Sequence, residues 1–134
     1  MTKFQMINPI DDSLYATICG WWKEYDFSAQ PLGALPTRGY VSLIGDKPII
    51  AGFLYTDPET LLGVFTFFGA NPESSDDERS KGFSELCEHV LEEARRIGIK
   101  CILTPTNNPS LSTRLTENGF KKADENVIHF YKEI

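Results

Sequence analysis

The strongest constraint on the fold is an apolar run that is followed by a long amphipathic helix and a second apolar run. Residues 61–69 read LLGVFTFFG and contain one polar side chain, Thr66, as is typical of a central strand covered on both faces. In the helix that follows, apolar residues recur at helical spacing, namely Phe83, Leu86, Cys87, Val90, Leu91 and Ala94. Gly98 offers a C-cap, and residues 99–104 form a short apolar strand. We expect the two strands to be parallel neighbours that the helix connects.

The remaining segments complete one mixed sheet. Residues 3–7 alternate like a strand, and residues 13–25 carry apolar positions at helical spacing, with Asp11 or Asp12 as N-cap. Residues 26–38 contain two prolines and predict a loop with at most one short helical turn. Further strands are expected at 39–44, 49–56 and 127–131, with a short helix that ends at Gly119. The sequence thus predicts a single domain over residues 1–134, an α/β fold (an α+β mixed sheet) with helices on both faces.

The charge balance argues against nucleic acid as the partner. The chain has 13 basic and 19 acidic residues, a net charge of −6. Proteins that bind nucleic acids normally present a basic face, because neutralising phosphates supplies much of their affinity. An acidic surface suits a cationic acceptor such as an amine. The predicted partner is therefore a small-molecule amine or a protein acceptor, bound by a monomer or a homodimer.

Three other features predict a cytoplasmic protein with no membrane and no metal site. No apolar run approaches the roughly 20 residues that a membrane span needs. The start of the chain, MTKFQMINPIDD, lacks the apolar core of a signal peptide. Cys19, Cys87 and Cys101 show no CxxC spacing, which indicates reduced core thiols rather than disulfides or metal ligands.

The order of these elements resembles the GNAT superfamily of N-acetyltransferases over essentially the whole chain. The most specific likeness is the segment Asn107-Asn108-Pro109-Ser110 through Gly119-Phe120, which is similar to the family's Asn, helix, Gly-Phe segment. The front half resembles a branch of small GNAT-like proteins that are common in phage genomes, through Trp21-Trp22, Pro31, Leu35-Pro36 and Gly39.

The resemblance implies a site for acetyl-CoA between two strands that splay apart. Its pantetheine amides would pair with the central strand, here Phe68, Gly69 and Ala70, and Asn107 would also bind it. Its pyrophosphate would lie at the start of the long helix, where free amide groups and the helix dipole favour an anion. The family's motif there is Gln or Arg, two residues, Gly, one residue, then Gly or Ala. The matching residues are Arg79, Ser80, Lys81, Gly82, Phe83 and Ser84, with Ser84 in place of the last small residue.

The residues themselves leave an alternative open at two of these positions. Ser75 and Glu78 fit a capping box, which would start the helix earlier and place Gly82 inside it, at a cost of about 1 kcal/mol relative to Ala. Three carboxylates would then occupy the end that pyrophosphate needs. Asn107 equally fits a cap for the helix that follows it.

The usual acid–base residues of the family are missing. GNAT enzymes often place a Glu on the central strand and a Tyr four residues before the Gly of Gly-Phe; here the strand has no carboxylate, and Leu115 stands at the Tyr position. The remaining catalytic candidates are Thr66, which could orient a water, and His129. Tyr40 and Tyr55 also lie on predicted strands, from which they could face the cleft.

The family's acceptor side corresponds to the segment around the Pro-rich loop. Trp22, Tyr25 and Phe27 are the candidates for acceptor binding. Because neighbouring side chains on a helix point about 100° apart, we expect only one of Trp21 and Trp22 to face the core. The first functional hypothesis is transfer of acetyl from acetyl-CoA to a primary amine. The second is a catalytically inactive GNAT-like module that binds a partner protein or senses acyl-CoA.

Overall fold

A computed structural model describes residues 4–7, 9–106, 108–128 and 130–134 of the chain. Its strands form a five-stranded sheet in the order β1-β2-β3-β4-β5. The elements are β1 (Phe4–Ile7), α1 (Asp12–Glu24), a 3-10 turn (Leu32–Ala34), β2 (Gly39–Ile44), β3 (Lys47–Thr56), β4 (Leu62–Ala70), α2 (Asp76–Ile97), β5 (Cys101–Leu103) and α3 (Pro109–Glu117). The predicted short helical turn in the Pro-rich loop is thereby confirmed.

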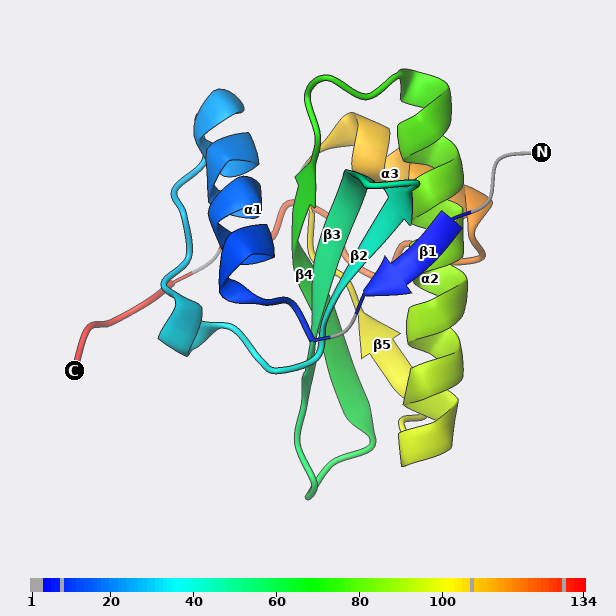
Figure 1. Ribbon diagram of the computed structural model, residues 1–134. Coiled ribbons are helices and arrows are strands. Elements are labelled where there is room, and N and C mark those ends of the chain that lie inside the picture. Colours follow the sequence, from blue (N-terminus) through cyan, green and yellow to red (C-terminus); the bar gives the residue numbers. More distant parts are fainter. Residues whose placement is uncertain (1–3, 8, 107, 129) are drawn as a thin grey trace.

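The sheet is mixed, and among the described strands the one parallel pair is the predicted one. Strands β1 to β4 pair antiparallel, whereas β4 and β5 are parallel and are joined by α2. The parallel register covers only Leu62↔Cys101 to Val64↔Leu103. Beyond Val64, β4 continues beside β3 alone, so the sheet forks between β4 and the chain that follows β5 (Figure 1).

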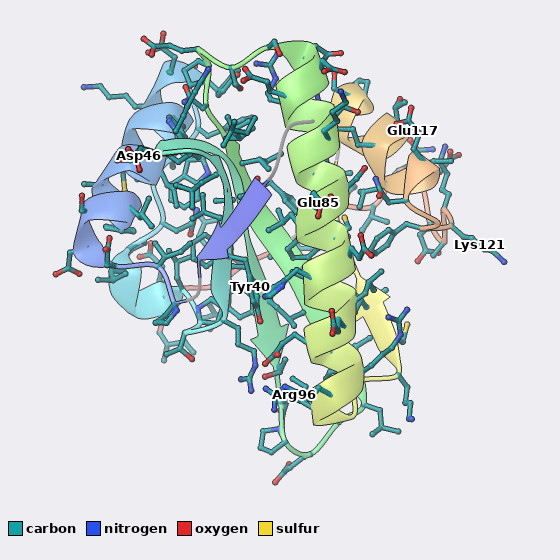
Figure 2. The ribbon with its side chains drawn as sticks, turned by 45° about the vertical axis from the view of Figure 1, so that its right-hand side comes forward. Tyr40, Asp46, Glu85, Arg96, Glu117 and Lys121 are labelled. Carbon is teal, nitrogen blue, oxygen red and sulfur yellow. The ribbon has the colours of Figure 1, made fainter. Side chains whose placement is uncertain are left out.

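Helices cover both faces of the sheet, as predicted (Figure 1). On one face α1 packs over a core cluster that includes Ile18, Val41 and Phe53. On the other face α2 packs over a larger cluster that includes Phe83, with Leu115 of α3 at its margin. Figure 2 shows α2 crossing this second face with Glu85 on its outer surface. Strands β2, β3 and β4 each contribute side chains to both clusters, so the sheet separates the two cores.

Both tryptophans of α1 are buried, contrary to the expectation that only one would be. Trp21 is 6% exposed and Trp22 is 3% exposed, and both belong to the cluster under α1. They follow Ile18 by three and four residues, so the axis of the buried face passes between them. Each indole then lies about 50° to one side of that axis, which a large side chain can still bury.

The start of α2 follows the capping-box alternative. The Ser75 hydroxyl accepts a bond from the Glu78 amide (3.0 Å), and the Glu78 carboxylate accepts one from the Ser75 amide (2.9 Å). The helix therefore begins at Asp76, and residues 79–84 are helical. The segment that matches the family's pyrophosphate motif therefore lies within α2 and not before its start, because local hydrogen bonds satisfy the helix start three residues before Arg79.

The predicted final strand is also wrong. Residues 127, 128, 130 and 131 adopt no strand, and Phe130 and Tyr131 are each 90% exposed. Alternation of apolar residues describes a strand's side chains, but a strand also needs a neighbour for its backbone. Among the described residues this segment has no such neighbour. His129 lies outside the described residues.

Candidate active site

The backbone of β4 bulges at the fork. Ala51 pairs with Gly69 and Phe53 pairs with Thr66, so between these two pairs β4 advances by three residues while β3 advances by two. Phe67, in this interval, has φ of 54°. The extra residue of a bulge leaves the ladder, and positive φ is unfavourable for a bulky side chain, so the surroundings must hold it.

Packing from α1 holds one side of this bulge. The Trp22 indole N–H donates to the Phe68 carbonyl oxygen at 2.9 Å. A Cβ at Gly69 would lie 3.2 Å from Ile18 Cγ2 and 3.3 Å from the Trp22 indole nitrogen. Glycine at 69 thus allows α1 to approach the strand closely enough for the indole to reach it.

Aromatic side chains hold the bulge on both faces. Phe67 packs on the α1 side, with its ring 5.9 Å from that of Tyr55. Phe68 packs on the α2 side, 4.6 Å from Phe65 and 5.6 Å from Phe83 between ring centroids. The two consecutive rings therefore anchor the bulge into both cores.

A cavity of about 550 Å³ opens at the bulge and is called the fork cavity here. Its size is typical of small-molecule sites. Its lining comes from both sides of the sheet and from the chain after β5: Trp22, Tyr25, Phe27, Ser28, Gln30, Ile50, Thr66, Phe67, Phe68, Gly69, Ala70, Asp76, Arg79, Pro105, Thr106, Asn108, Ser110, Leu111 and Arg114. The cavity therefore links the face under α1 with the face under α2 and α3.

Two arginines mark what we call the arginine end of the cavity. Arg79, in the first turns of α2, donates to the Ser74 carbonyl and lies 3.3 Å from the Ser74 hydroxyl. Arg114 of α3 forms an ion pair with Asp76 at 2.9 Å. The Arg114 side chain is 13% exposed, whereas that of Asp76 is 86% exposed. The arginine end thus carries two guanidinium groups, of which Arg114 is paired with a largely exposed carboxylate and Arg79 is bonded to Ser74.

The opposite, aromatic end is formed by Trp22, Tyr25, Phe27 and Phe67, with neutral polar residues between them. Trp22 is buried, but Tyr25 and Phe27 are 44% and 56% exposed. All of the predicted acceptor-side and central-strand residues are therefore brought together in one cavity.

Comparison with solved structures defines the fold, although no family model and no curated protein matches the sequence. A probable acetyltransferase superposes with a TM-score of 0.69 at 14% identity, over 98% of this chain and 97% of that one. N-acetylglutamate synthase from Neisseria gonorrhoeae, complexed with coenzyme A and N-acetylglutamate, gives 0.71 at 18% identity, over 96% of this chain and 30% of that one. An aminoglycoside acetyltransferase from an uncultured soil sample, in complex with sisomicin, gives 0.63 at 10% identity, over 98% and 95%.

The chain has the GNAT acetyltransferase fold. The likeness extends over nearly all of this chain, and at these identities it defines the fold rather than the reaction. The fork cavity lies beyond the parallel pair of β4 and β5 that the sequence predicted, between residues 66–70 of β4 and the chain after β5.

The GNAT pyrophosphate motif departs from expectation in its position. Of residues 79–84, only Arg79 lines the fork cavity. Gly82 and Phe83 lie on the buried face of α2, and Lys81 forms an ion pair with Asp77 at 3.0 Å. Ser80 and Ser84 lie on the same helix away from the cavity lining. Asn107 lies outside the described residues, and Asn108 is the residue that caps α3, through a 3.1 Å bond from the Leu111 amide.

Neither tyrosine candidate lines the cavity. Tyr40 is buried beneath α2, where burial and the nearby Glu93 raise its pKa to about 12. The Tyr55 hydroxyl donates to the Ala34 carbonyl at 2.8 Å, and burial raises its pKa. Leu115, at the family's Tyr position, belongs to the core with 6% exposure. Thr66 does line the cavity, so it is the one described catalytic candidate that faces it.

The residues that sequence reasoning missed are Asp76 and Arg114 above all. Their ion pair joins positions 38 residues apart, and no local sequence pattern predicts a contact between residues so distant in the chain. Among the described cavity residues, Asp76 is the single carboxylate. The described site therefore offers hydroxyl groups and arginines but no free carboxylate base.

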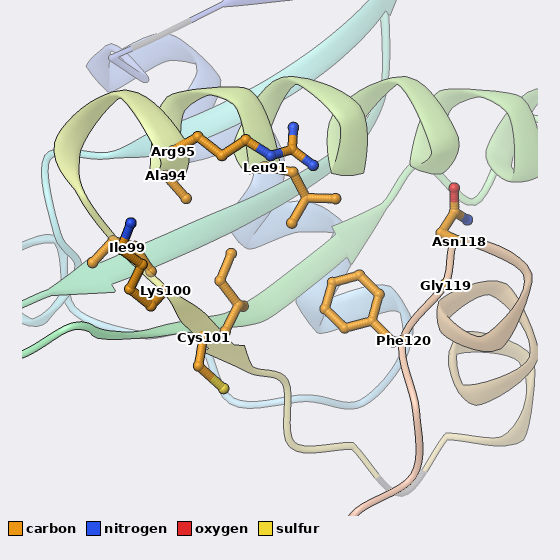
Figure 3. A pocket seen from close by; sticks show the side chains of 10 residues that line it. Leu91, Ala94, Arg95, Ile99, Lys100, Cys101, Asn118, Gly119 and Phe120 are labelled. Atoms are coloured by element: carbon orange, nitrogen blue, oxygen red, sulfur yellow. The ribbon is translucent and has the colours of Figure 1, made fainter.

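A second, smaller cavity of about 250 Å³ lies beside β5 (Figure 3). Leu91, Ala94, Ile99 and Phe120 form its apolar side, and Arg95 and Lys100 lie at its margin. Its volume is below the usual range for ligand sites, and none of its lining residues was predicted to bind a ligand or to take part in catalysis. The fork cavity is therefore the candidate active site.

Within the described residues, no group of three or more His, Cys, Asp or Glu side chains is arranged to hold a metal ion. The helices described here also lack a stretch long and apolar enough to cross a bilayer. The three cysteines are free, with Cys87 buried and Cys101 exposed, so Cys101 is not the core thiol that was expected.

Proposed function

We propose that the protein is an N-acetyltransferase that moves the acetyl group of acetyl-CoA to a primary amine of a small molecule or a protein. One observation carries the proposal: a single cavity joins an arginine end to an aromatic end across a bulged strand. An anionic donor and an amine acceptor can thus enter from different sides and meet at the bulge. The GNAT fold and the neighbour solved with coenzyme A support the same donor.

The residues present fit the chemical groups of acetyl-CoA. Arg79 and Arg114 would bind its phosphates, because guanidinium groups form charge-assisted, often bidentate bonds with phosphate. The backbone of Phe68 to Ala70, which pairs with β3 on one edge and lies beyond the last β5 pair on the other, would pair with its amides. Asp76 opposes this binding by its charge, but it is exposed and already paired with Arg114. The anion site is thus built from two helices rather than from a loop before α2.

The transfer itself needs a neutral amine. The amine nitrogen attacks the thioester carbon, the C–N bond forms, the C–S bond breaks, the amine loses a proton and the thiolate gains one. Since the described lining holds no free carboxylate, the amine must arrive deprotonated from solvent. The residues then contribute positioning and exclusion of water. The rate should rise with pH towards the pKa of the acceptor amine.

Calorimetry with acetyl-CoA and with free CoA tests the proposal. Arg114→Ala should weaken binding by about 10- to 100-fold, because a charge-assisted bond contributes about 1.5–3 kcal/mol. Lys81→Ala is the matched control: it removes a cation of α2 that does not line the cavity. Wild-type protein that binds neither compound would refute the proposal. Binding without transfer to any amine between about pH 6 and about pH 10 would instead identify a sensor of acyl-CoA.

A further inference from the structure

The aromatic end of the fork cavity is held in a fixed geometry by the end of α1. The Phe27 amide donates to the Trp22 carbonyl at 2.7 Å, and the Asp26 amide donates to the Lys23 carbonyl at 3.1 Å. These two bonds form a Schellman motif, whose left-handed position is usually Gly. Here it is Asp26, with φ of 60°. The backbone that carries Tyr25 and Phe27 is therefore closed on the helix and not a free loop end.

The loop that follows is tied to the same helix. The Tyr15 hydroxyl of α1 donates to the Gln30 carbonyl at 2.6 Å. Gln30 and Ser28 both line the fork cavity beside Phe27. The aromatic end is thus bounded on both sides by residues anchored to α1, and its exposed rings are presented before any ligand binds.

The distribution of charge in the cavity lining favours amines with one charge over polycations. Within the described lining, the ionisable side chains that carry charge are Asp76, Arg79 and Arg114, all at the arginine end. The aromatic end offers rings, Ser28, Gln30 and Thr66. Glu24 and Asp26 are near in sequence, but they are exposed and do not line the cavity. A polycation needs carboxylates close to each of its charges, and the aromatic end has none in its described lining.

We propose that the acceptor is a monoamine carried on an aromatic or other apolar body, which packs against Tyr25 and Phe27 and presents one nitrogen to the bulge near Thr66. This inference rests on the proposed function for the transfer step, but the selectivity of binding can be measured without it. Half-exposed aromatic rings in a pocket mark a surface made to be covered by an apolar partner. Aromatic faces also attract a single ammonium group.

Ligand-observed NMR with phenethylamine and with spermidine tests this selectivity directly, in the presence and absence of CoA. Phenethylamine should bind at least about tenfold more tightly than spermidine. Phe27→Asp should remove most of this preference, because it replaces a ring with a carboxylate at the cavity. Leu61→Asp is the matched control. Leu61 is an exposed apolar residue just before the start of β4, at the end of the strand away from the cavity, so this variant should leave the preference unchanged.

Several results would overturn the inference. Equal or tighter binding of spermidine or of an aminoglycoside would do so, as would a Phe27→Asp variant with wild-type selectivity and intact CoA affinity. A folded-state check by circular dichroism and CoA calorimetry accompanies each variant. If acetyl transfer occurs, kcat/KM for the two amines should follow the same order as binding. Loss of CoA binding in the wild type would refute the proposed function alone, because the amine comparison in the absence of CoA would still decide this inference.

Discussion

The two edges of β4 behave in opposite ways. Towards β3 the strand is paired from Ile50↔Ala70 to Thr56↔Gly63, nearly its whole length. Towards β5 it has three pairs and then a cavity. The same residues therefore close the sheet on one side and form a binding surface on the other. The bulge allows β4 to serve both roles. One extra residue of β4 leaves the hydrogen-bond ladder, and the pairing with β3 continues on either side of it.

The edge of β4 that pairs with β3 is called the closed edge, and the edge beyond the β5 pairs is called the open edge. The contrast shows that the geometry of the site depends on how tightly side chains pack at the closed edge. The β3 edge admits little change, since its side chains lie in both cores. The open edge instead faces a cavity whose lining includes half-exposed rings and two partly buried arginines. The three predictions that follow perturb the closed edge, the bulge between the edges, and the start of α2 next to the open edge.

The largest effect is expected from Gly52→Ala at the closed edge. A Cβ at this position would lie 2.6 Å from Phe65 Cε1 and 3.1 Å from Phe68 Cδ1. Phe65 is fully buried and cannot move aside freely, so overpacking should lower the free energy of unfolding by about 1–3 kcal/mol. Urea unfolding measures this change. Gly20→Ala is the control: the exposed glycine of α1 has no atom within 4 Å of its would-be Cβ, and this variant should be as stable as the wild type or more so. An equal loss in both variants would contradict the prediction.

A smaller effect is expected from Trp22→Phe at the bulge. Trp21→Phe removes the same volume from the same cluster, but only Trp22 donates to the Phe68 carbonyl. The Trp22 variant should lose about 1 kcal/mol more than the Trp21 variant, which is the usual net contribution of one hydrogen bond. It should also weaken CoA binding more. Urea unfolding and calorimetry on both variants provide the comparison. Identical values for the two would mean that the indole bond does not hold the bulge.

The smallest effect concerns pH and the start of α2. Two contacts lower the pKa of Glu78 below its usual 4.5: the hydrogen bond from the Ser75 amide has the larger effect, and the hydrogen bond from Lys47 has the smaller one. Its stabilising contribution is therefore fully present above that value and is lost as the pH falls through the lowered pKa. Glu78→Gln can keep the capping box, so its stability should change little at neutral pH and should fall less on acidification. Glu85→Gln, on the outer surface of α2 (Figure 2), should retain the acid sensitivity of the wild type. Acid titrations followed by circular dichroism would refute the prediction if both variants behaved alike.

Much of the site was accessible from the sequence, through patterns and through the GNAT resemblance. Thr66, Arg79, the segment from Phe68 to Ala70, and the three acceptor-side aromatics were all nominated, and all line the fork cavity. The motif over residues 79–84 failed beyond Arg79, because the Ser75–Glu78 capping box starts α2 earlier. Leu115 was treated as a site position, but its side chain fills the core under α2. Each failure came from carrying a pattern to a position where local bonds or packing decide otherwise.

The sequence alone determined the parts of this protein that depend on neighbours in the chain. Asp11 and Ser75 cap the starts of two helices and Gly98 caps an end, through bonds to residues a few positions away. Apolar spacing sets which helix faces are buried. Tertiary structure decided where distant residues meet. It gave Arg114 a partner in Asp76, buried both tryptophans and left residues 127 and 128 without a strand to join. The reason is physical: a local bond needs few residues to be ordered, whereas an ion pair across 38 positions forms only after the sheet and both helices have fixed its ends.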